Sequence, residues 1–280
     1  MAVVTISPKS MRDRINRRTV KLVATDTLDR LTGKRDGMIP PTRHMFDGPS
    51  DIESFKANGQ EFLTYFKELG ELKPSDKVLD VGSGMGRKTM PLTTYLNKKG
   101  SYEGLEIVKR GVDWCNKKIN RKHPNFKFQL ADVYNELYNP GGHYPASEYV
   151  FPYKDNQFDF VILGSVFTHM KPDDLENYLS QIARVMKPGG RAIISYFLIN
   201  DESAKLIKNG KSSIEIKFNQ GKYFTADPNN LEGATGYDEE AIMKLYKKNG
   251  LAMFKPIQYG SWSGRKNYLS YQDLVIGVKN

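Results

Sequence analysis

The sequence predicts an α/β protein whose core is a doubly wound, mostly parallel sheet of about seven strands with helices on both faces. Three observations lead to this prediction. Short apolar runs alternate five times with stretches of helical periodicity, as in successive β-α-β units. The run 158–166 is almost entirely apolar, as expected for a strand buried on both faces of a parallel sheet. The first run, 78–81, ends at three glycines in alternate positions, which predicts a tight strand-to-helix turn.

Residues 1–73 precede this sheet, and we expect them to form a basic arm and a helical cap. Asp51 is a predicted N-cap, and apolar residues recur at helical spacing over 52–69 until Gly70. The residues just before this helix either line a ligand pocket or cap the core: Arg43, Met45 and Phe46.

The arm carries much of the net charge of +10, since residues 1–43 contain ten basic and four acidic side chains. Such an excess suits a nucleic acid, an anionic lipid surface or an acidic substrate, and it equally suits a solvated arm. No aromatic residue lies among these charges before Phe46, so base stacking on the arm is not expected. The basic side chains are Lys9, Arg12, Arg14, Arg17, Arg18, Lys21, Arg30, Lys34, Arg35 and Arg43.

The cysteine content and hydropathy indicate a soluble, cytoplasmic protein without a structural metal. Cys115 is the single cysteine of the 280 residues, and no Cys/His cluster has zinc spacing. We expect Cys115 to be a buried small hydrophobe. No stretch of ~18 apolar residues predicts a transmembrane helix.

The glycine turn is the first candidate binding site. Glycines allow positive φ and a close approach of ligand to main chain, and a helix start offers free N–H groups. Gly82 and Gly84 fit the dinucleotide fingerprint G-x-G-x-x-G, but its third glycine is replaced by Arg87, and Gly86 comes one position early. A pyrophosphate-binding turn is therefore less favoured than a turn that binds another small polar ligand.

Polar residues end the next predicted strands at the same edge of the sheet. Glu106 ends the strand 101–107, twenty residues beyond Gly86, where a carboxylate accepts hydrogen bonds from a ribose. Asp132 ends the strand 126–133, and Gly164 with Ser165 lies near the end of the fourth strand. Carboxyl ends of parallel strands share one edge, so these groups predict a single binding site.

Two insertions interrupt the alternation of strands and helices. Residues 134–157 are rich in tyrosine and are interpreted as a lid facing the substrate or, alternatively, as a packed surface loop. Residues 200–236 are polar and predict a second excursion near the site. The remaining elements are a helix from Pro172 that ends at 187–190, a strand at 191–198, a helix at 238–248 and strands at 251–257 and 273–278.

From about residue 74 to 280 these features together resemble a class I S-adenosyl-L-methionine-dependent methyltransferase with a Rossmann-like sheet, of a broad bacterial group of undefined acceptor. The resemblance rests on Val-Leu-Asp-Val-Gly-Ser-Gly-Met-Gly at 78–86, Ala-Asp-Val at 131–133, Phe-Asp-Phe-Val at 158–161 and Arg-Val-Met-Lys-Pro-Gly-Gly at 184–190. It implies S-adenosylmethionine as cofactor, with the adenine amino group on Asp132 and a main-chain donor at Val133. The implied cofactor-binding residues are Asp80, Gly82, Ser83, Gly84, Gly86, Arg87, Glu106, Ile107, Asp132, Val133, Gly164 and Ser165.

The resemblance implies in-line transfer of a methyl group, and the sequence favours a small-molecule or glycan acceptor with oxygen preferred over nitrogen. The Asp/Asn-Pro-Pro-aromatic motif of base methylases is absent after the fourth strand. His169 is the candidate general base, with packing of the next helix as its alternative role. Alternatively, Tyr144, Tyr149 or Tyr153 positions the acceptor. Two alternatives are an RNA or other nucleic-acid methyltransferase that uses the basic arm and an NAD-dependent oxidoreductase.

Overall fold

The computed structural model describes residues 20, 22–48 and 51–280, and its centre is a seven-stranded sheet in the order β10-β11-β5-β4-β1-β2-β3. The five strands from β3 to β5 are parallel, whereas β11 is antiparallel to both β5 and β10. The predicted doubly wound, mostly parallel sheet is confirmed. Its strands are β1 (Lys77–Val81), β2 (Ser101–Glu106), β3 (Phe126–Leu130), β4 (Phe158–Leu163), β5 (Met186–Tyr196), β10 (Leu251–Met253) and β11 (Asp273–Lys279).

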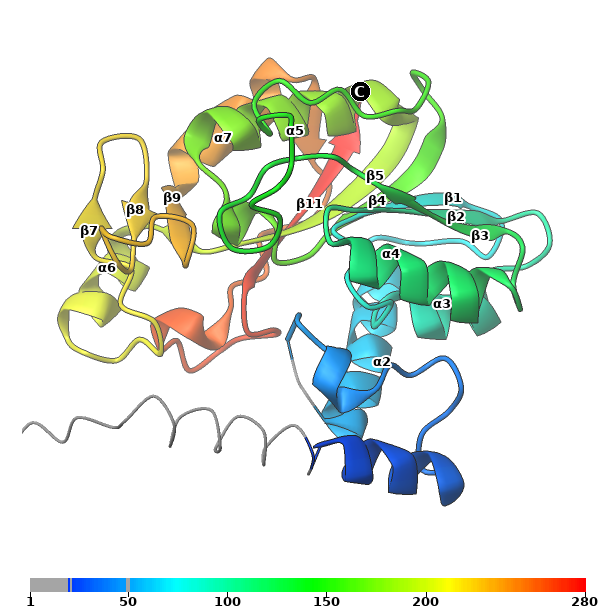
Figure 1. Ribbon diagram of the computed structural model, residues 1–280. Coiled ribbons are helices and arrows are strands. Elements are labelled where there is room, and N and C mark those ends of the chain that lie inside the picture. Colours follow the sequence, from blue (N-terminus) through cyan, green and yellow to red (C-terminus); the bar gives the residue numbers. More distant parts are fainter. Residues whose placement is uncertain (1–19, 21, 49–50) are drawn as a thin grey trace, which may run out of the picture.

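Helices cover both faces of this sheet (Figure 1). On one face, side chains of α2 (Ile52–Glu68), α3 (Thr89–Tyr95) and α4 (Lys109–Cys115) share a buried cluster with the sheet. On the other face, α5 (Pro172–Val185) and α7 (Glu239–Lys248) contribute to the larger cluster. The chain order reverses between β1 and β4, which makes this junction the topological switch point of the sheet.

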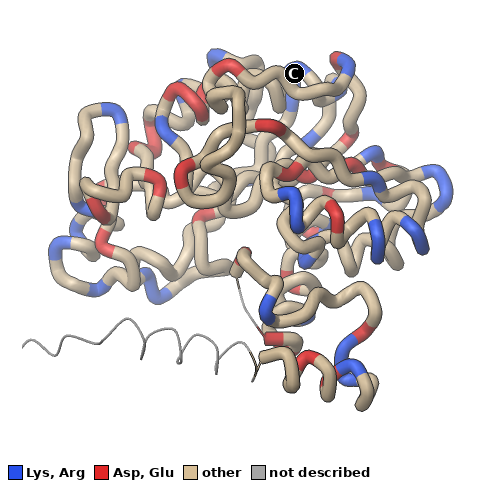
Figure 2. The backbone as a smooth tube through the Cα atoms, viewed as in Figure 1, with Lys and Arg blue, Asp and Glu red and all other residues tan. Residues whose placement is uncertain are grey.

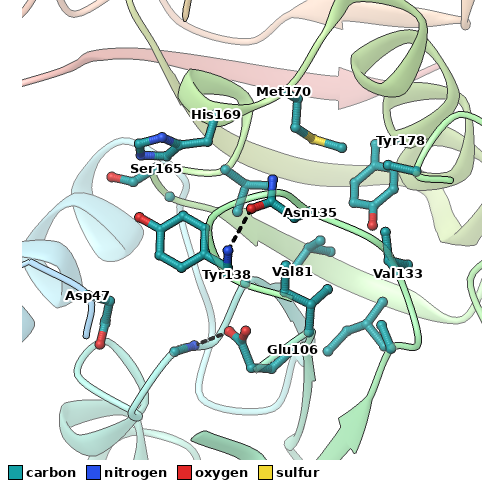
Figure 3. A pocket seen from close by; sticks show the side chains of 18 of the residues that line it. Asp47, Val81, Glu106, Val133, Asn135, Tyr138, Ser165, His169, Met170 and Tyr178 are labelled. Atoms are coloured by element: carbon teal, nitrogen blue, oxygen red, sulfur yellow. Dashed lines mark hydrogen bonds between the residues drawn. The ribbon is translucent and has the colours of Figure 1, made fainter. Parts of the chain in front are cut away.

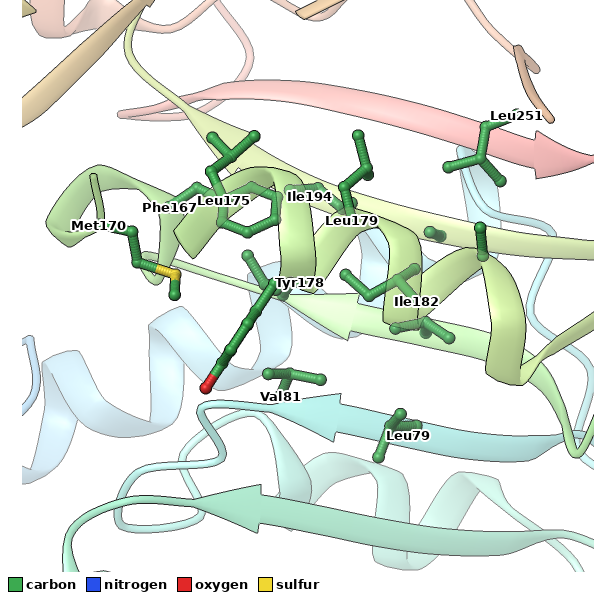
Figure 4. Close-up of a cluster of buried hydrophobic side chains, with 14 of the residues drawn as sticks. Leu79, Val81, Phe167, Met170, Leu175, Tyr178, Leu179, Ile182, Ile194 and Leu251 are labelled. Atoms are coloured by element: carbon green, nitrogen blue, oxygen red, sulfur yellow. The ribbon is translucent and has the colours of Figure 1, made fainter. Parts of the chain in front are cut away.

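A stripe of apolar side chains along α5 and the first residue of β5 is buried against the sheet (Figure 4). Pro172 occupies the first turn of this helix, as predicted. Tyr178 extends from the helix toward Val81 at the end of β1, with its hydroxyl beyond the apolar cluster. The stripe consists of Leu175, Tyr178, Leu179, Ile182, Val185 and Met186.

The boundary after α5 differs from the prediction. The helix ends at Val185, and β5 begins at Met186, so the residues expected to form a turn belong to the strand. The pairing with β4 shifts register between Phe158 and Phe160, and Gly189 has φ +74°. The irregular start of β5 accommodates the Pro-Gly-Gly sequence at 188–190. Hydrophobic periodicity alone does not show whether such a sequence forms a strand or a loop.

The segment after β5 forms a second, smaller sheet with its own core. Its order is β6-β9-β8-β7, and α6 (Asp201–Lys208) lies beside it (Figure 1). Phe197, Ile216 and Trp262 are among the buried residues of that core. The strands are β6 (Leu198–Ile199), β7 (Phe218–Asn219), β8 (Phe224–Thr225) and β9 (Thr235–Asp238).

The N-terminal region contains a helix over 22–31 that hydrophobic periodicity does not reveal. Val23, Leu28 and Leu31 are exposed on it, so apolar burial does not explain how the helix is held. Its buried residue is Asp26, which pairs with Arg43 at 2.7 Å and accepts a hydrogen bond from the Thr42 N–H. An ion pair between the buried Asp26 carboxylate and the more exposed Arg43 therefore attaches this helix.

The basic arm is described only in part. Lys9, Arg12, Arg14, Arg17, Arg18 and Lys21 lie outside the described residues. Of the others, Arg35 donates to the Asp26 carbonyl, and Arg43 pairs with the Asp26 carboxylate. In the described chain, Lys and Arg are interspersed with Asp and Glu (Figure 2). Within that same part of the chain, no helix combines the length and hydropathy needed to cross a bilayer.

Candidate functional site

A cavity of about 390 Å³ lies at the carboxyl edge of the sheet, at the switch point beside the end of β1. It has two halves (Figure 3). The glycine-turn half is lined by Asp47, Gly82, Gly84, Arg87, Glu106 and Val133. The His169 half is lined by Tyr138, His169, Met170, Asp174, Tyr178, Glu232 and Gln272.

The glycine turn has the backbone that its sequence predicts. Gly82, Gly84 and Gly86 have φ of +81°, +57° and +84°. A Cβ at Gly82 would lie 2.4 Å from the Val166 side chain, and one at Gly84 would lie 2.6 Å from the Asp47 carboxylate. Both the conformation and the space therefore require glycine.

Glu106 lies beside this turn and bonds to its main chain. Its carboxylate accepts hydrogen bonds from the N–H groups of Gly84, at 2.7 Å, and Val108, at 2.8 Å (Figure 3). Burial raises the pKa of Glu106 to about 7, although these two bonds oppose the shift. Each oxygen keeps further acceptor capacity toward the cavity, as the predicted ribose-binding role requires.

Arg87 occupies the position of the third fingerprint glycine, and it joins the N-terminal cap to the turn. Its guanidinium donates to the Asp47 main-chain carbonyl and to the Asp47 carboxylate, each at 3.1 Å. Gly48 packs so closely on the guanidinium that a Cβ there would overlap it. Arg87, which departs from the dinucleotide fingerprint, therefore links the N-terminal cap to the glycine turn through hydrogen bonds to Asp47.

His169 reaches the cavity from a 3-10 turn, Phe167–His169, that follows β4. Its Nδ1 lies 2.8 Å from the carbonyl oxygen of Glu232, which only accepts, so Nδ1 carries the proton in this contact. Burial lowers the pKa of His169 below its usual value. The imidazole is therefore neutral near pH 7, with an unprotonated Nε2.

The Glu232 side chain is buried and ties the second insertion to the first. Its carboxylate accepts hydrogen bonds from the Asn135 amide, at 2.9 Å, and the Glu136 N–H, at 3.1 Å. Tyr138 packs edge-on against His169, with ring centroids 5.6 Å apart. The two predicted excursions thus meet at His169 and enclose this half of the cavity.

Ser165 has a strained backbone at the mouth of the cavity. Its φ is +62°, which is unusual for a residue with a side chain. Its N–H donates to the Ser195 hydroxyl at 2.7 Å, and its own hydroxyl donates to the side-chain amide oxygen of Gln272, Oε1, at 2.9 Å. These bonds hold the end of β4 and the neighbouring Gly164 against the cavity.

The structure brings nine of the predicted site residues to the cavity wall: Gly82, Gly84, Arg87, Glu106, Ile107, Val133, Gly164, Ser165 and His169. Three others lie at or directly before the glycine turn without lining the cavity. Asp80 is buried and accepts a hydrogen bond from the Tyr102 hydroxyl at 2.7 Å. Ser83 is buried beside Gly104, and Gly86 packs against Ile119 and Cys115. Cys115 is buried, as predicted.

The remaining three predicted residues lie away from the cavity wall. Asp132 is half exposed and pairs with His143 at 2.7 Å, and the Tyr144 ring is exposed. Tyr153 packs edge-on against Phe158, the first residue of β4, at the amino edge of the sheet. A connection between two parallel strands must return from the carboxyl edge to the amino edge, so the later part of 134–157 leaves the site.

Several cavity residues were not predicted because no local pattern marks them. Asp47, Lys88, Asn135, Asp174, Tyr178, Glu232 and Gln272 line the cavity from several parts of the chain, with Asp174 and Tyr178 both on α5. Tyr178 reads as part of the apolar stripe of α5, and only its length carries the hydroxyl into the cavity. Phe46 lines the cavity, as one of the two interpretations of the cap proposed.

Comparison with known proteins agrees with this geometry. Residues 78–190, which span the glycine turn, Glu106 and His169, match a family model described as a methyltransferase domain. These residues form a methyltransferase domain of the class I, S-adenosylmethionine-dependent type. This match sets aside the alternative of an NAD-dependent oxidoreductase.

Three individual similarities describe this methyltransferase further. A C-methyltransferase of ubiquinone/menaquinone biosynthesis from Wigglesworthia glossinidia brevipalpis is 31% identical over 156 residues, covering 55% of this chain and 55% of that protein. An O-methyltransferase from Penicillium expansum is 28% identical over 177 residues, covering 61% of this chain and 55% of that protein. The chain thus spans about half the length of these relatives.

The third similarity concerns the fold. Magnesium protoporphyrin IX methyltransferase from Synechocystis PCC 6803, solved with bound S-adenosylhomocysteine, superposes with a TM-score of 0.53 at 16% identity, covering 94% of this chain and 100% of that one. This likeness extends the methyltransferase fold beyond the matched domain.

The residues of the glycine-turn half fit the cofactor of this family, S-adenosylmethionine. The turn is kept free of side chains where a Cβ would fill it, and Glu106 has acceptor capacity for ribose hydroxyls. An Asp47 oxygen, Oδ1, is buried without a hydrogen-bond partner. Among the described residues, no group of three or more His, Cys, Asp or Glu is arranged to hold a metal ion.

Proposed function

We propose that this protein transfers a methyl group to a hydroxyl oxygen of an uncharged small molecule or glycan, with His169 as the general base. The observation that carries the proposal is the bond between His169 Nδ1 and the Glu232 carbonyl, which leaves Nε2 as a proton acceptor at the cavity. S-adenosylmethionine supplies the methyl group on an activated sulfonium. The protein then has to hold the acceptor in line and accept its proton, and alignment alone can contribute ~7–11 kcal/mol.

The charge distribution supports an uncharged acceptor. The cationic side chains that line the described cavity, Arg87 and Lys88, both belong to the turn that begins α3. The His169 half contains the carboxyl groups of Asp174 and Glu232 and the rings of Tyr138 and Tyr178. Burial raises the pKa of Asp174. Such a wall disfavours phosphate and carboxylate groups and suits hydroxyls on an apolar or sugar framework.

The proposed acceptor atom, oxygen, is the one named for the O-methyltransferase relative, whereas the other relative is named a C-methyltransferase. A hydroxyl must lose a proton when it is methylated, so an oxygen acceptor uses the neutral His169 directly. The nucleic-acid alternative depends on the basic arm, most of whose cations lie outside the described residues.

The test supplies the protein with tritium-labelled S-adenosylmethionine and four separate acceptor pools. These are simple phenols including catechol, neutral oligosaccharides, aliphatic amines and total RNA. We expect label in the phenol or oligosaccharide pool, with mass spectrometry placing the methyl group on oxygen. Label confined to RNA or to the amines would contradict the proposal.

A further inference from the structure

We propose that the Asp47 carboxylate, carried by the N-terminal cap and held by Arg87, binds the α-ammonium group at the amino-acid end of the cofactor. The inference rests on the proposed use of S-adenosylmethionine and adds a specificity-determining residue from outside the matched domain. Asp47 precedes the matched region, 78–190, and helix α2 lies between them.

The position of Asp47 is the first argument. It lines the cavity across the glycine turn from Glu106 (Figure 3). A Cβ on Gly84 would lie 2.6 Å from Oδ2 and 3.3 Å from Oδ1, so the carboxylate sits directly over the main chain of the turn. A ligand that rests on Gly84 must therefore meet the Asp47 carboxylate.

Unused hydrogen-bonding capacity is the second argument. Asp47 Oδ2 accepts from Arg87 at 3.1 Å, whereas Oδ1 is buried without a partner in the described structure. A buried carboxylate oxygen without a donor is unfavourable, and a ligand donor at the cavity would satisfy it. The terminal torsion of aspartate is soft, which allows the carboxylate to turn one oxygen to the cavity while Arg87 keeps the other.

The charge balance around the turn is the third argument. Three carboxyl groups, Asp47, Asp80 and Glu106, face two cations, Arg87 and Lys88. Burial is the main cause that raises the pKa of both Asp80 and Glu106, and the nearby Asp47 carboxylate adds to the shift in each. An added cationic group relieves this excess of negative charge, and an ammonium is cationic at neutral pH.

Arg87 acts as a positioning residue in this arrangement. Its two bonds fix both the main chain and the side chain of Asp47, and Gly48 is required for the close packing on its guanidinium. The replacement of a fingerprint glycine by Arg87 thus gives the cap a fixed carboxylate over the cofactor end of the cavity.

The test compares three ligands by isothermal titration calorimetry on the full chain. S-adenosylhomocysteine carries both the ammonium and the carboxylate, its decarboxylated analogue keeps only the ammonium, and 5′-methylthioadenosine has neither. We expect Asp47→Asn to weaken the two ammonium-bearing ligands roughly ten- to a hundredfold, the loss of one charge-assisted bond. Affinity for 5′-methylthioadenosine should stay within about twofold, because adenosine contacts are unchanged.

Asp51→Asn is the matched control. It removes a nearby carboxylate from the same segment while Asn keeps the N-cap of α2, so all three affinities should be unchanged. If Asp47→Asn unfolds, Asp47→Glu keeps the charge but displaces it and should show the same selective loss. An equal loss for all three ligands, or none, would overturn the inference. Failure of the unmodified protein to bind S-adenosylhomocysteine would instead contradict the proposed function.

Discussion

The glycine-turn half of the cavity comes mainly from one continuous stretch and the ends of β2 and β3, whereas the His169 half is assembled from segments far apart in sequence. Gly82, Gly84 and Arg87 lie within six residues of chain. Tyr138, His169, Glu232 and Gln272 come from four different connections. The first half is therefore set by local backbone conformation, and the second by how the two insertions dock on the sheet.

The two halves also differ in what holds them. Positive φ values and close steric contacts at its glycines determine the conformation of the turn, so these glycine positions favour glycine over other residues. The His169 half depends on hydrogen bonds between side chains and main chain, such as Asn135 to Glu232 and His169 to the Glu232 carbonyl. Substitutions in the first half should weaken cofactor binding, while those in the second should change turnover and acceptor affinity.

The largest effect is expected from Gly82→Ala. The new Cβ would meet Val166 at 2.4 Å in a backbone with φ +81°, so the turn must move. We expect S-adenosylhomocysteine binding to fall more than about a hundredfold, as measured by calorimetry. Gly250→Ala is the control, because Gly250 has φ +71° and no atom within 4 Å. It should destabilise by about 1–2 kcal/mol and leave binding intact.

Loss of His169, the proposed general base, is expected to have the next largest effect. His169→Asn should reduce kcat about 10²–10⁴-fold while leaving S-adenosylhomocysteine affinity unchanged, because it acts in the other half of the cavity. Burial lowers the pKa of His169, so activity of the unmodified protein should rise with pH through a value below 6.5 and then level off. The variant should lack this limb in a pH profile. An unaltered profile would remove His169 from the mechanism.

Glu106→Gln tests the buried carboxylate that joins the turn to β2. Affinity for S-adenosylhomocysteine should fall about tenfold, since an amide carries no charge to strengthen hydrogen bonds from ribose. The folded pKa of Glu106, about 7, lies above the ordinary value of 4.5, so the folded state binds the proton more tightly. This contribution to stability is present below pH 4.5 and is lost as pH rises through 7. Thermal unfolding of the ligand-free variant should therefore depend less on pH in this window.

The smallest effects should separate the two groups of tyrosines in 134–157. Tyr138→Phe removes a hydroxyl beside His169 and should raise the KM for the acceptor about three- to tenfold. Tyr153→Phe removes a buried hydroxyl without a hydrogen-bond partner, so kinetics should be unchanged and stability unchanged or higher. Equal kinetic effects of the two substitutions would contradict the division between the site and the amino edge of the sheet.

The sequence by itself determined the sheet, the glycine turn and the location of the cavity at the carboxyl ends of the strands. These features follow from local periodicity and from the backbone freedom of glycine. Gly82, Gly84 and Glu106 lie at the cavity where their pattern predicted them. His169 was also predicted, since it follows a buried central strand closely. The identity of its hydrogen-bond partner was not.

Only the tertiary structure decided which residues of the insertions reach the cavity. Tyr138 and Tyr153 look alike in sequence, but the return of the chain to β4 separates them. Asp47 and Glu232 carry no local signal because their roles arise from contacts with Arg87 and Asn135, formed over long sequence separations. Local patterns encode backbone shape, whereas the pairing of distant polar groups depends on how elements pack. That packing determined the position of the N-terminal cap and the composition of the His169 half of the cavity.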